Sequence, residues 1–300
     1  MNTILTPKIP LIMALFCIIT STLFLTILVY ILDNSQSWTT GSRKCSKRSR
    51  WELKALSQQV TQDDNIQIFP RSSSPPHLVV ITERHCCDSD AVLQRALQLL
   101  HAAVTPDQVD LVSVRINVLS ADKNHRRRLV ELANRLLHWS DRHHFQVVVS
   151  SDWIDVAVET GVHGLHVNES DRHKIPALRK LLEGRPLIGT TAHTLESAVS
   201  AFEVHRPDYF FVGSCYFSQS YPEKTTLEGP ELPGQVCRAL QEIAGARRPK
   251  VLAIGGINAS NCHEPVTKYG AEGVAILRSV FEGENPAESL HFIRKNMAKL

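Results

Sequence analysis

The sequence predicts an α/β protein whose main part is a single (β/α)8 TIM barrel over residues 76–300. Eight short runs rich in Val, Ile and Leu occur in this part, as expected for parallel strands buried on both faces. Stretches with helical spacing of apolar residues separate these runs, which is the alternation of a closed parallel barrel. The composition, 43% hydrophobic and 21% charged, supplies enough apolar material for a sizeable core.

An apolar segment near the N-terminus is long enough to cross a membrane. After a tail of residues 1–8, residues 9–32 contain no charged side chain, and a helix of that length spans a hydrocarbon core of about 30 Å. Five cations follow within residues 43–50, whereas Lys8 is the only charged side chain before the segment. The positive-inside rule therefore predicts a membrane anchor at residues 9–32 that holds the barrel in the cytoplasm.

The same region has a second interpretation, which the sequence leaves open. Residues 33–75 form a polar linker that is rich in Ser and Arg near its start. An apolar leader followed by such a stretch is also typical of a two-part, plastid-like organelle address that is removed from the mature protein. The N-terminal sequence of the mature protein would distinguish an anchor from a cleaved leader.

Charge and cysteine content exclude several other classes. A net charge of +3 is too small to imply a nucleic-acid partner. The seven cysteines show no paired CxxC spacing, which argues against a zinc site and a disulfide framework and favours a reducing compartment. The sequence does not set the oligomeric state, and a homo-oligomer stays open.

Strands and helices alternate throughout residues 76–300. Thr194 is a plausible N-cap for a helix over residues 194–205, and a helix over 258–269 would follow Gly255 and Gly256. The alternative architecture, an open doubly wound sheet, normally carries a Gly-rich turn after its first strand, and residues 82–85 contain no glycine. The predicted strands are residues 77–82, 109–116, 145–149, 162–167, 186–190, 208–212, 250–254 and 272–276.

In such a barrel, the active site lies at the carboxyl ends of the strands. Asp152 follows the third predicted strand and Asp171 follows the fourth, so both carboxylates are expected near the mouth of the barrel. Together they could hold Mg²⁺, with water and a substrate phosphate as the remaining ligands. The alternative role for each aspartate is to cap a helix N-terminus.

Three further strand ends carry candidate site residues. Arg115 alternates with apolar neighbours and is expected to point into the barrel, where a buried guanidinium suits an anion or a structural ion pair. Gly255 and Gly256 follow the seventh strand and would let backbone N–H groups approach a phosphate. His193, after the fifth strand, is a candidate acid or base, or a structural histidine.

Five segments in this order resemble the thiamine phosphate synthase/TenI superfamily, over nearly all of residues 77–300. No segment is diagnostic by itself, but five in register around one barrel are specific for the superfamily. The matching segments are residues 164–171, 188–198, 208–213, 251–258 and 270–275.

The resemblance implies an enzyme that joins hydroxymethylpyrimidine diphosphate to thiazole phosphate and releases diphosphate. Its substrates are small phosphorylated heterocycles and its cofactor is Mg²⁺. By resemblance, Asp152 and Asp171 hold the metal, Arg115 meets the diphosphate, Thr191 lies at the substrate site and Gly256 lies near the thiazole phosphate. The further substrate-binding positions are Ser151, Ser218, Ser220, Lys224, Gly255 and Arg278.

Several of these positions depart from the family pattern. Ser113 and Asn117 replace Gln and Lys, and Ser151 replaces Asn. The lysine of the loop after strand six is Tyr221, with Lys224 three residues on, and Arg278 replaces a serine. These changes keep two alternatives open: a TenI-type thiazole tautomerase without metal that uses His193 as a proton shuttle, and a non-catalytic relative that binds phosphate ligands.

Overall fold

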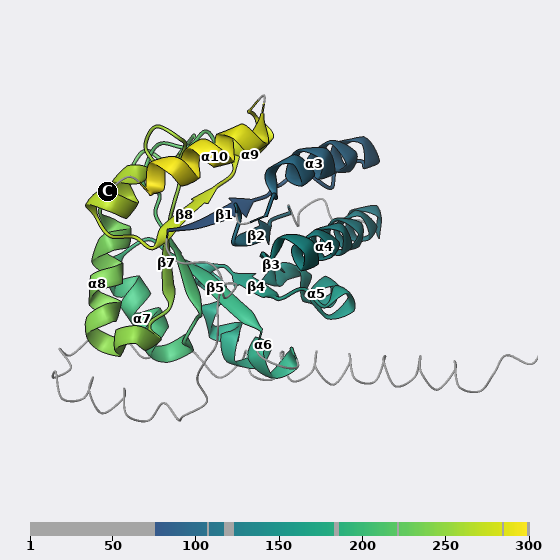
Figure 1. Cartoon of the computed structure of the whole chain (residues 1–300). Helices are drawn as coiled ribbons and strands as arrows, with labels where there is room; N and C mark the ends of the chain where they lie inside the picture. The colour runs from purple at the N-terminus through teal and green to yellow at the C-terminus, as the bar shows by residue number, and fades with distance from the viewer. Residues whose placement is uncertain are drawn as a thin grey trace, which may run out of the picture. The chain divides into compact units, whose positions relative to one another are not determined.

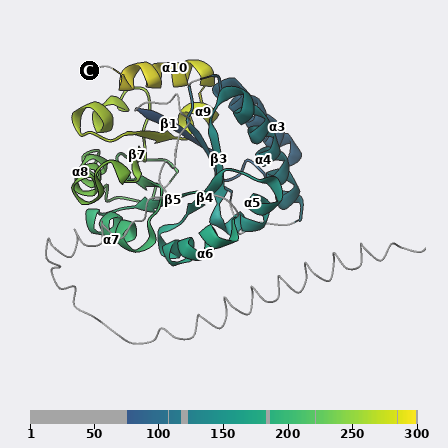
Figure 2. The ribbon, with the colours of Figure 1, turned by 60° about the horizontal axis from the view of Figure 1, so that its bottom comes forward.

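The barrel is closed, as predicted. The computed structural model describes residues 76–106, 108–116, 123–182, 186–220, 222–283 and 285–298, so the predicted tail, membrane segment and linker (residues 1–75) lie outside them. Eight parallel strands follow one another in chain order around the barrel, and β1 pairs with β8 to close it. Helices surround the strands (Figures 1 and 2). Among the described residues, no helix combines the length and the apolarity that a membrane crossing requires.

Each of the eight predicted runs overlaps one strand, although β3 and β5 extend one and two residues beyond the predicted ends. The observed strands are shorter at several ends because the flanking polar residues, such as Asp110 and Asp208, lie just outside the ladder. Parallel pairing buries both faces of every strand, which explains the continuous Val, Ile and Leu runs. The strands are β1 (His77–Ile81), β2 (Leu111–Val114), β3 (Gln146–Ser150), β4 (Gly164–Val167), β5 (Leu187–Ala192), β6 (Tyr209–Val212), β7 (Lys250–Ile254) and β8 (Gly273–Ile276).

The helices cover the outside of the barrel, and three of them, α3, α7 and α10, have side-chain N-caps; Asn285 Oδ1 accepts the N–H of Glu288 at the start of α10. Ser89 Oγ accepts the N–H of Val92 at the start of α3, and Thr194 Oγ1 accepts the N–H of Ser197 at the start of α7. The predicted cap at Thr194 is therefore confirmed. The helices are α3 (Asp90–Ala103), α4 (Lys123–His143), α5 (Ile154–Thr160), α6 (Ile175–Leu181), α7 (Leu195–His205), α8 (Leu232–Ala244), α9 (Arg278–Phe281) and α10 (Pro286–Met297). Short 3-10 turns are η2 (Ser151–Trp153), η3 (Glu169–Lys174) and η4 (Gly245–Arg247).

The helix predicted over residues 258–269 is wrong in its first half. Only η5 (Glu264–Lys268), one turn with π-helical hydrogen bonds, forms there. Asn258 Oδ1 accepts the N–H of Ser260 at 2.8 Å, and Asn261 Oδ1 accepts the N–H of Asn258 at 2.8 Å. These side-chain bonds offer the backbone a turn in place of a helix.

Side chains fill the inside of the barrel, which is a packed core and not a pore. A cluster inside the barrel includes Tyr209 and Phe211 from β6 and Leu252 from β7, all buried. Gly189 of β5 lies against the ring of Tyr209, so that any larger residue at this position would overlap it. A second, larger cluster lies between the strands and helices α3, α4 and α10.

A repeated arrangement closes the amino end of the barrel. The residue directly before each of β2, β4, β6 and β8 accepts a hydrogen bond with its side chain. The donor is the backbone N–H of the second residue in the strand that precedes it in the chain. The accepting residue donates its own backbone N–H to the carbonyl of that partner. The four side-chain bonds are Leu78 N–H to Asp110 Oδ2 (2.7 Å), Val147 N–H to His163 Nδ1 (3.0 Å), Ile188 N–H to Asp208 Oδ2 (2.7 Å) and Val251 N–H to Glu272 Oε2 (3.0 Å).

Cations neutralise the three carboxylates of this arrangement. Arg294 of α10 lies 2.6 Å from Asp110, and Arg179 of α6 lies 2.8 Å from Asp208. Arg248 and Lys250 both pair with Glu272. The sequence analysis did not predict this set, although a polar acceptor directly before strands two, four, six and eight is a visible pattern.

Candidate active site

The candidate site is a cavity of about 630 Å³ at the carboxyl ends of the strands. Residues that follow most of the eight strands contribute to its wall, as expected for this fold. Most of the predicted site residues meet there, whereas Ser151, Asp152 and Asp171 are not part of the wall. The predicted residues that line the cavity are Arg115, Thr191, His193, Ser218, Ser220, Lys224, Gly255, Gly256 and Arg278.

Arg115 points into the cavity, which confirms the expectation from its position after β2. Its backbone N–H donates to Thr82 Oγ1 at 2.9 Å, and that hydroxyl donates to the Arg115 carbonyl at 3.2 Å, so the ends of β1 and β2 are tied together. Burial, with a smaller contribution from the charge of Arg84, lowers the pKa of Arg115 to about 10. A partly buried cation in a cavity wall is suited to an anionic ligand.

His166 is a cavity residue that the sequence analysis missed. It lies on β4 between the buried Leu165 and Val167, and this alternation is the signal that directs its ring into the barrel. Its Nε2 lies 3.0 Å from Thr191 Oγ1, and its Nδ1 lies 3.2 Å from the Tyr209 hydroxyl.

The ring of His166 also stacks on Phe211 at 4.6 Å between centroids. Burial, with a smaller contribution from Arg115, lowers the pKa of His166 to about 3. The imidazole is therefore neutral at physiological pH and can donate or accept a hydrogen bond.

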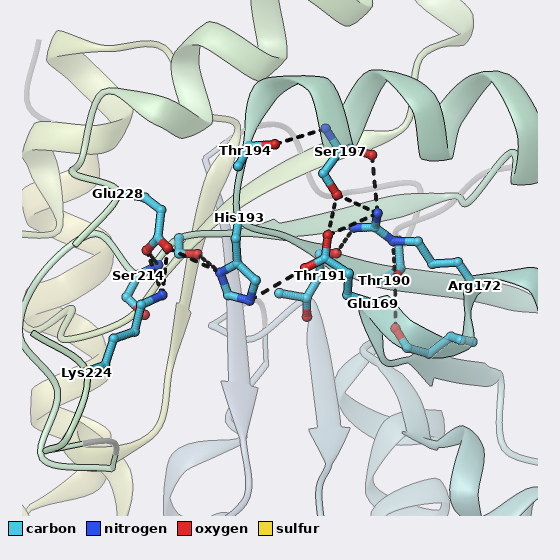
Figure 3. A network of polar contacts seen from close by, with 12 residues as sticks. Glu169, Arg172, Thr190, Thr191, His193, Thr194, Ser197, Ser214, Lys224 and Glu228 are labelled. Atoms are coloured by element: carbon cyan, nitrogen blue, oxygen red, sulfur yellow. Dashed lines mark hydrogen bonds and ion pairs between the residues drawn. The ribbon is translucent and has the colours of Figure 1, made fainter. Parts of the chain in front are cut away.

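A network of polar contacts crosses the mouth of the cavity from the loop after β6 to the end of β4 (Figure 3). His193 is at its centre, with Nδ1 bonded to the carbonyl of Gly213. The Nδ1 of His193 lies 3.7 Å from Glu228, and its Nε2 lies 3.9 Å from Glu169. The imidazole thus lies between two carboxylates.

Arg172 forms the other end of the network and was not predicted. It is buried and donates to Thr190 Oγ1 at 3.2 Å, to Ser197 Oγ at 2.6 Å and to the carbonyl of Thr191. Its Nη1 also lies 3.3 Å from Glu169. Arg172 therefore holds η3 against β5 and α7 and positions the carboxylate that faces His193 (Figure 3).

Asp152 and Asp171 are not among the residues that line the cavity. Asp152 accepts a hydrogen bond from Ser150 Oγ at 2.9 Å, and Asp171 pairs with Lys174 at 2.9 Å. The alternative role as helix caps is wrong for Asp152, because the side chain of Ser150 caps η2. Within the described part of the chain, no group of three or more His, Cys, Asp or Glu side chains is placed to hold a metal ion.

Two glycines directly after β7 form another part of the cavity wall. Gly255 and Gly256 have φ of 98° and 64°, where a side chain would be strained. A Cβ on Gly255 would lie 2.7 Å from Ser214 Cβ, and one on Gly256 would lie 2.8 Å from Tyr216 Cβ. Both glycines therefore let the loop after β6 lie against β7, and the helix N-terminus expected after them does not form.

Arg278, at the start of α9, also lines the cavity, as Gly256 does. Its Nη2 lies 2.8 Å from Glu282, which belongs to the same wall. The positions of Asn117 and Tyr221, where the sequence departs from the family pattern, lie outside the described residues.

Comparison with known proteins gives a consistent result. The family model described as thiamine monophosphate synthase matches residues 78–280. The thiamine-phosphate synthase of Chlorobium phaeovibrioides is 33% identical over 159 residues, which cover 50% of this chain and 70% of that protein. The thiamine-phosphate synthase of Caldanaerobacter subterraneus subsp. tengcongensis is 25% identical over 169 residues, which cover 56% of this chain and 74% of that protein.

A solved structure shows the same fold. The thiamine phosphate pyrophosphorylase of Pyrococcus furiosus superposes with a TM-score of 0.58 at 22% identity, covering 74% of this chain and 95% of that one.

Proposed function

This chain belongs to the thiamine monophosphate synthase family, and from that premise we propose that it joins hydroxymethylpyrimidine diphosphate to thiazole phosphate. In this reaction the bond between the pyrimidine methylene carbon and the diphosphate oxygen breaks, and its electron pair leaves with diphosphate. The thiazole nitrogen then supplies the pair for the new carbon–nitrogen bond. No atom is oxidised or reduced.

The observation that carries the proposal is the composition of the cavity wall. A partly buried guanidinium, Arg115, faces the same cavity as the neutral His166 and the hydroxyl of Thr191. A cation beside uncharged hydrogen-bonding groups suits a substrate with a charged phosphate end and a polar, uncharged heterocycle. Arg115 would stabilise the negative charge that grows on the departing diphosphate.

The two aspartates suit Mg²⁺ by the type of their donor atoms. Mg²⁺ prefers oxygen ligands and is commonly held by one or two carboxylates together with water and substrate phosphate. Asp152 bonds to Ser150, and the N–H of Asp171 donates to the carbonyl of Asn168 at 3.0 Å; Ser150 and Asn168 both line the cavity. We propose that these carboxylates hold Mg²⁺ when the diphosphate substrate is bound. The ion would neutralise charge on the leaving diphosphate.

The direct test is a single-turnover assay of the full chain with both substrates and Mg²⁺. Formation of thiamine phosphate and diphosphate in equal amounts is the expected result, and Asp171→Asn should reduce it strongly. Lys174→Gln is the matched control, because it removes the partner of Asp171 without removing the carboxylate. Absence of product in a single turnover, with both substrates shown to bind, would reject the transferase.

One observation favours a second candidate, a thiazole tautomerase. His193 lies at the cavity mouth between Glu169 and Glu228, as a proton shuttle would require. A tautomerase needs no metal, so undiminished activity in the presence of a chelator and loss of activity in His193→Asn would select it. Binding of phosphate ligands without either turnover would instead indicate a non-catalytic relative.

We also propose that residues 9–32 anchor the chain in a membrane. The support is the uncharged run itself and the five cations that follow it. Retention in the membrane fraction after alkaline carbonate extraction is the expected result. A mature N-terminus beyond residue 32 would instead identify a cleaved leader.

A further inference from the structure

One carboxylate that is not itself part of the cavity wall contacts three groups that belong to the wall. Glu228 lies near the end of the segment that joins β6 to α8. Both of its oxygens accept from Lys224 Nζ, at 2.7 and 2.8 Å, and its Oε2 also accepts the backbone N–H of Ser214. Its Oε1 lies 3.7 Å from His193 Nδ1 (Figure 3). Ser214, Lys224 and His193 line the cavity.

The same residue closes the neck of a loop. The backbone N–H of Glu228 donates to the Ser214 carbonyl at 3.1 Å, so two hydrogen bonds join positions 214 and 228. The segment between them contributes Phe217, Ser218 and Lys224 to the cavity wall. Glu228 therefore determines where this wall, and the ammonium group that it carries, lies.

The groups around Glu228 are those that proteins use to bind anions. An ammonium, a backbone N–H and an imidazole converge on one carboxylate, which takes two of the three donors of Lys224. Burial alone would raise the pKa of Glu228, but Lys224 and the Ser214 N–H outweigh it and leave the pKa below its ordinary value. Ionised Glu228 thus offsets the positive charge that Lys224 would otherwise present to a ligand.

We infer that Glu228 is a positioning residue and the internal counter-anion of this wall. It holds Ser214, Lys224 and His193 together, and its charge weakens their attraction for a phosphate-bearing ligand. The inference rests on the proposed function only for the choice of diphosphate as the ligand class.

The test measures binding of inorganic diphosphate to the full chain by calorimetry, without metal. Glu228→Gln keeps an oxygen for the Ser214 N–H but removes the charge, so binding should tighten by about twofold to fivefold. In a Lys224→Met background the gain should be smaller, because the released cation is absent. Glu264→Gln is the matched control. Glu264 pairs with Lys268 at 3.0 Å with the same i,i+4 spacing, and neither residue lines the cavity. This variant should leave binding unchanged.

Three results would overturn the inference: unchanged or weaker binding in Glu228→Gln, an equal gain with and without Lys224, or no diphosphate binding in any variant. Thermal unfolding checks that each variant is folded. If Glu228→Gln does not fold, Lys224→Met alone decides: it should weaken binding by about twofold to fivefold, and unchanged binding rejects the inference. None of these measurements uses turnover, so the transferase proposal stands or falls separately.

Discussion

The two ends of the barrel use buried charge in different ways. At the amino end, Asp110, Asp208 and Glu272 each accept a backbone N–H and each pair with a cation from a helix or strand. At the carboxyl end, Arg115 is partly buried in a cavity wall, and burial lowers its pKa. Ion pairs formed within the chain stabilise a fold, whereas a cation in a cavity wall can also contact a ligand.

The difference teaches where substitutions should affect stability and where they should affect binding. A change at the amino end breaks contacts that exist in the folded chain, so the free energy of unfolding should fall. A change at the carboxyl end removes a group that faces the cavity, so the loss should appear mainly in binding or turnover. The four predictions below test this division, from the largest expected effect to the smallest.

Asp110→Ala should have the largest effect on stability. It removes the acceptor of the Leu78 N–H and leaves Arg294 without its carboxylate, 2.6 Å away in the wild type. Breaking a buried ion pair from one side costs about 3–5 kcal/mol of unfolding free energy. Denaturant unfolding measures it, and Asp110→Asn, which keeps one oxygen, should cost less. A cost below that of an average surface substitution would contradict the stabilising role of the amino end.

Arg115→Met should show the opposite pattern. Removing a group that stabilises charge in the transition state costs about a hundredfold or more in kcat/KM. Burial already disfavours the charged guanidinium in the folded chain, so the unfolding free energy should change little. Steady-state kinetics and denaturant unfolding on the same preparation measure both quantities. Arg126→Met, on the exposed face of α4, serves as control and should change neither strongly. A large loss of stability in Arg115→Met would place this arginine in the structural class.

His166→Asn should change the pH dependence of stability. The folded pKa of about 3 lies below the ordinary 6.5, so between these values the unfolded chain binds more protons and stability falls as pH falls. This contribution amounts to at most about 1.4 kcal/mol per pH unit. The variant should therefore lose less stability than the wild type when unfolding is compared at pH 6.5 and at lower pH. Parallel losses in the two proteins would show that the ring is accessible to water.

Asp208→Asn should have the smallest effect at the amino end, about 1 kcal/mol. Burial raises the pKa of Asp208 even though Arg179 and the Ile188 N–H act against it. The ionised form is thus disfavoured in the folded state, and stability falls as pH rises from the ordinary 3.8 through the raised value. An uncharged amide keeps an acceptor for the Ile188 N–H and avoids this penalty. Unfolding at neutral pH should show a smaller loss than Asp110→Asn does.

The dependence of the unfolding free energy on acidic pH also distinguishes the carboxylates at the amino end of the barrel. At Asp110 burial alone would raise the pKa, but His77 and Arg294 outweigh it and lower the pKa; at Glu272 burial is outweighed in the same way by Arg248 and Lys250. A carboxyl with a depressed folded pKa contributes stability above its unfolded value and loses it as pH falls. Asp110 and Glu272 should thus oppose Asp208 in this range, which explains why Asp110 and Asp208 are tested separately.

Patterns in the sequence were sufficient to predict the eight strands and many of the residues that line the cavity. Eight apolar runs predicted eight strands, and the position of Arg115 among apolar neighbours predicted its direction. The helix over 258–269 failed because Asn258 and Asn261 bond to the local backbone, a competition that apolar spacing does not reveal. Asp152 and Asp171 were expected near the mouth; they contact Ser150 and Lys174 and are not among the residues of the cavity wall.

The sequence by itself determined the barrel, because strand burial on both faces leaves a pattern in the order of apolar residues. It also determined which side chains follow the strands, and so which end carries the site. Only the tertiary structure decided which polar groups each charged side chain contacts. These contacts are Glu228 with Lys224 and Ser214, Arg172 with Thr190 and Ser197, and Arg294 with Asp110. Most of these pairs join segments far apart in the chain, and their contacts depend on barrel closure and on side-chain direction, neither of which a linear pattern records.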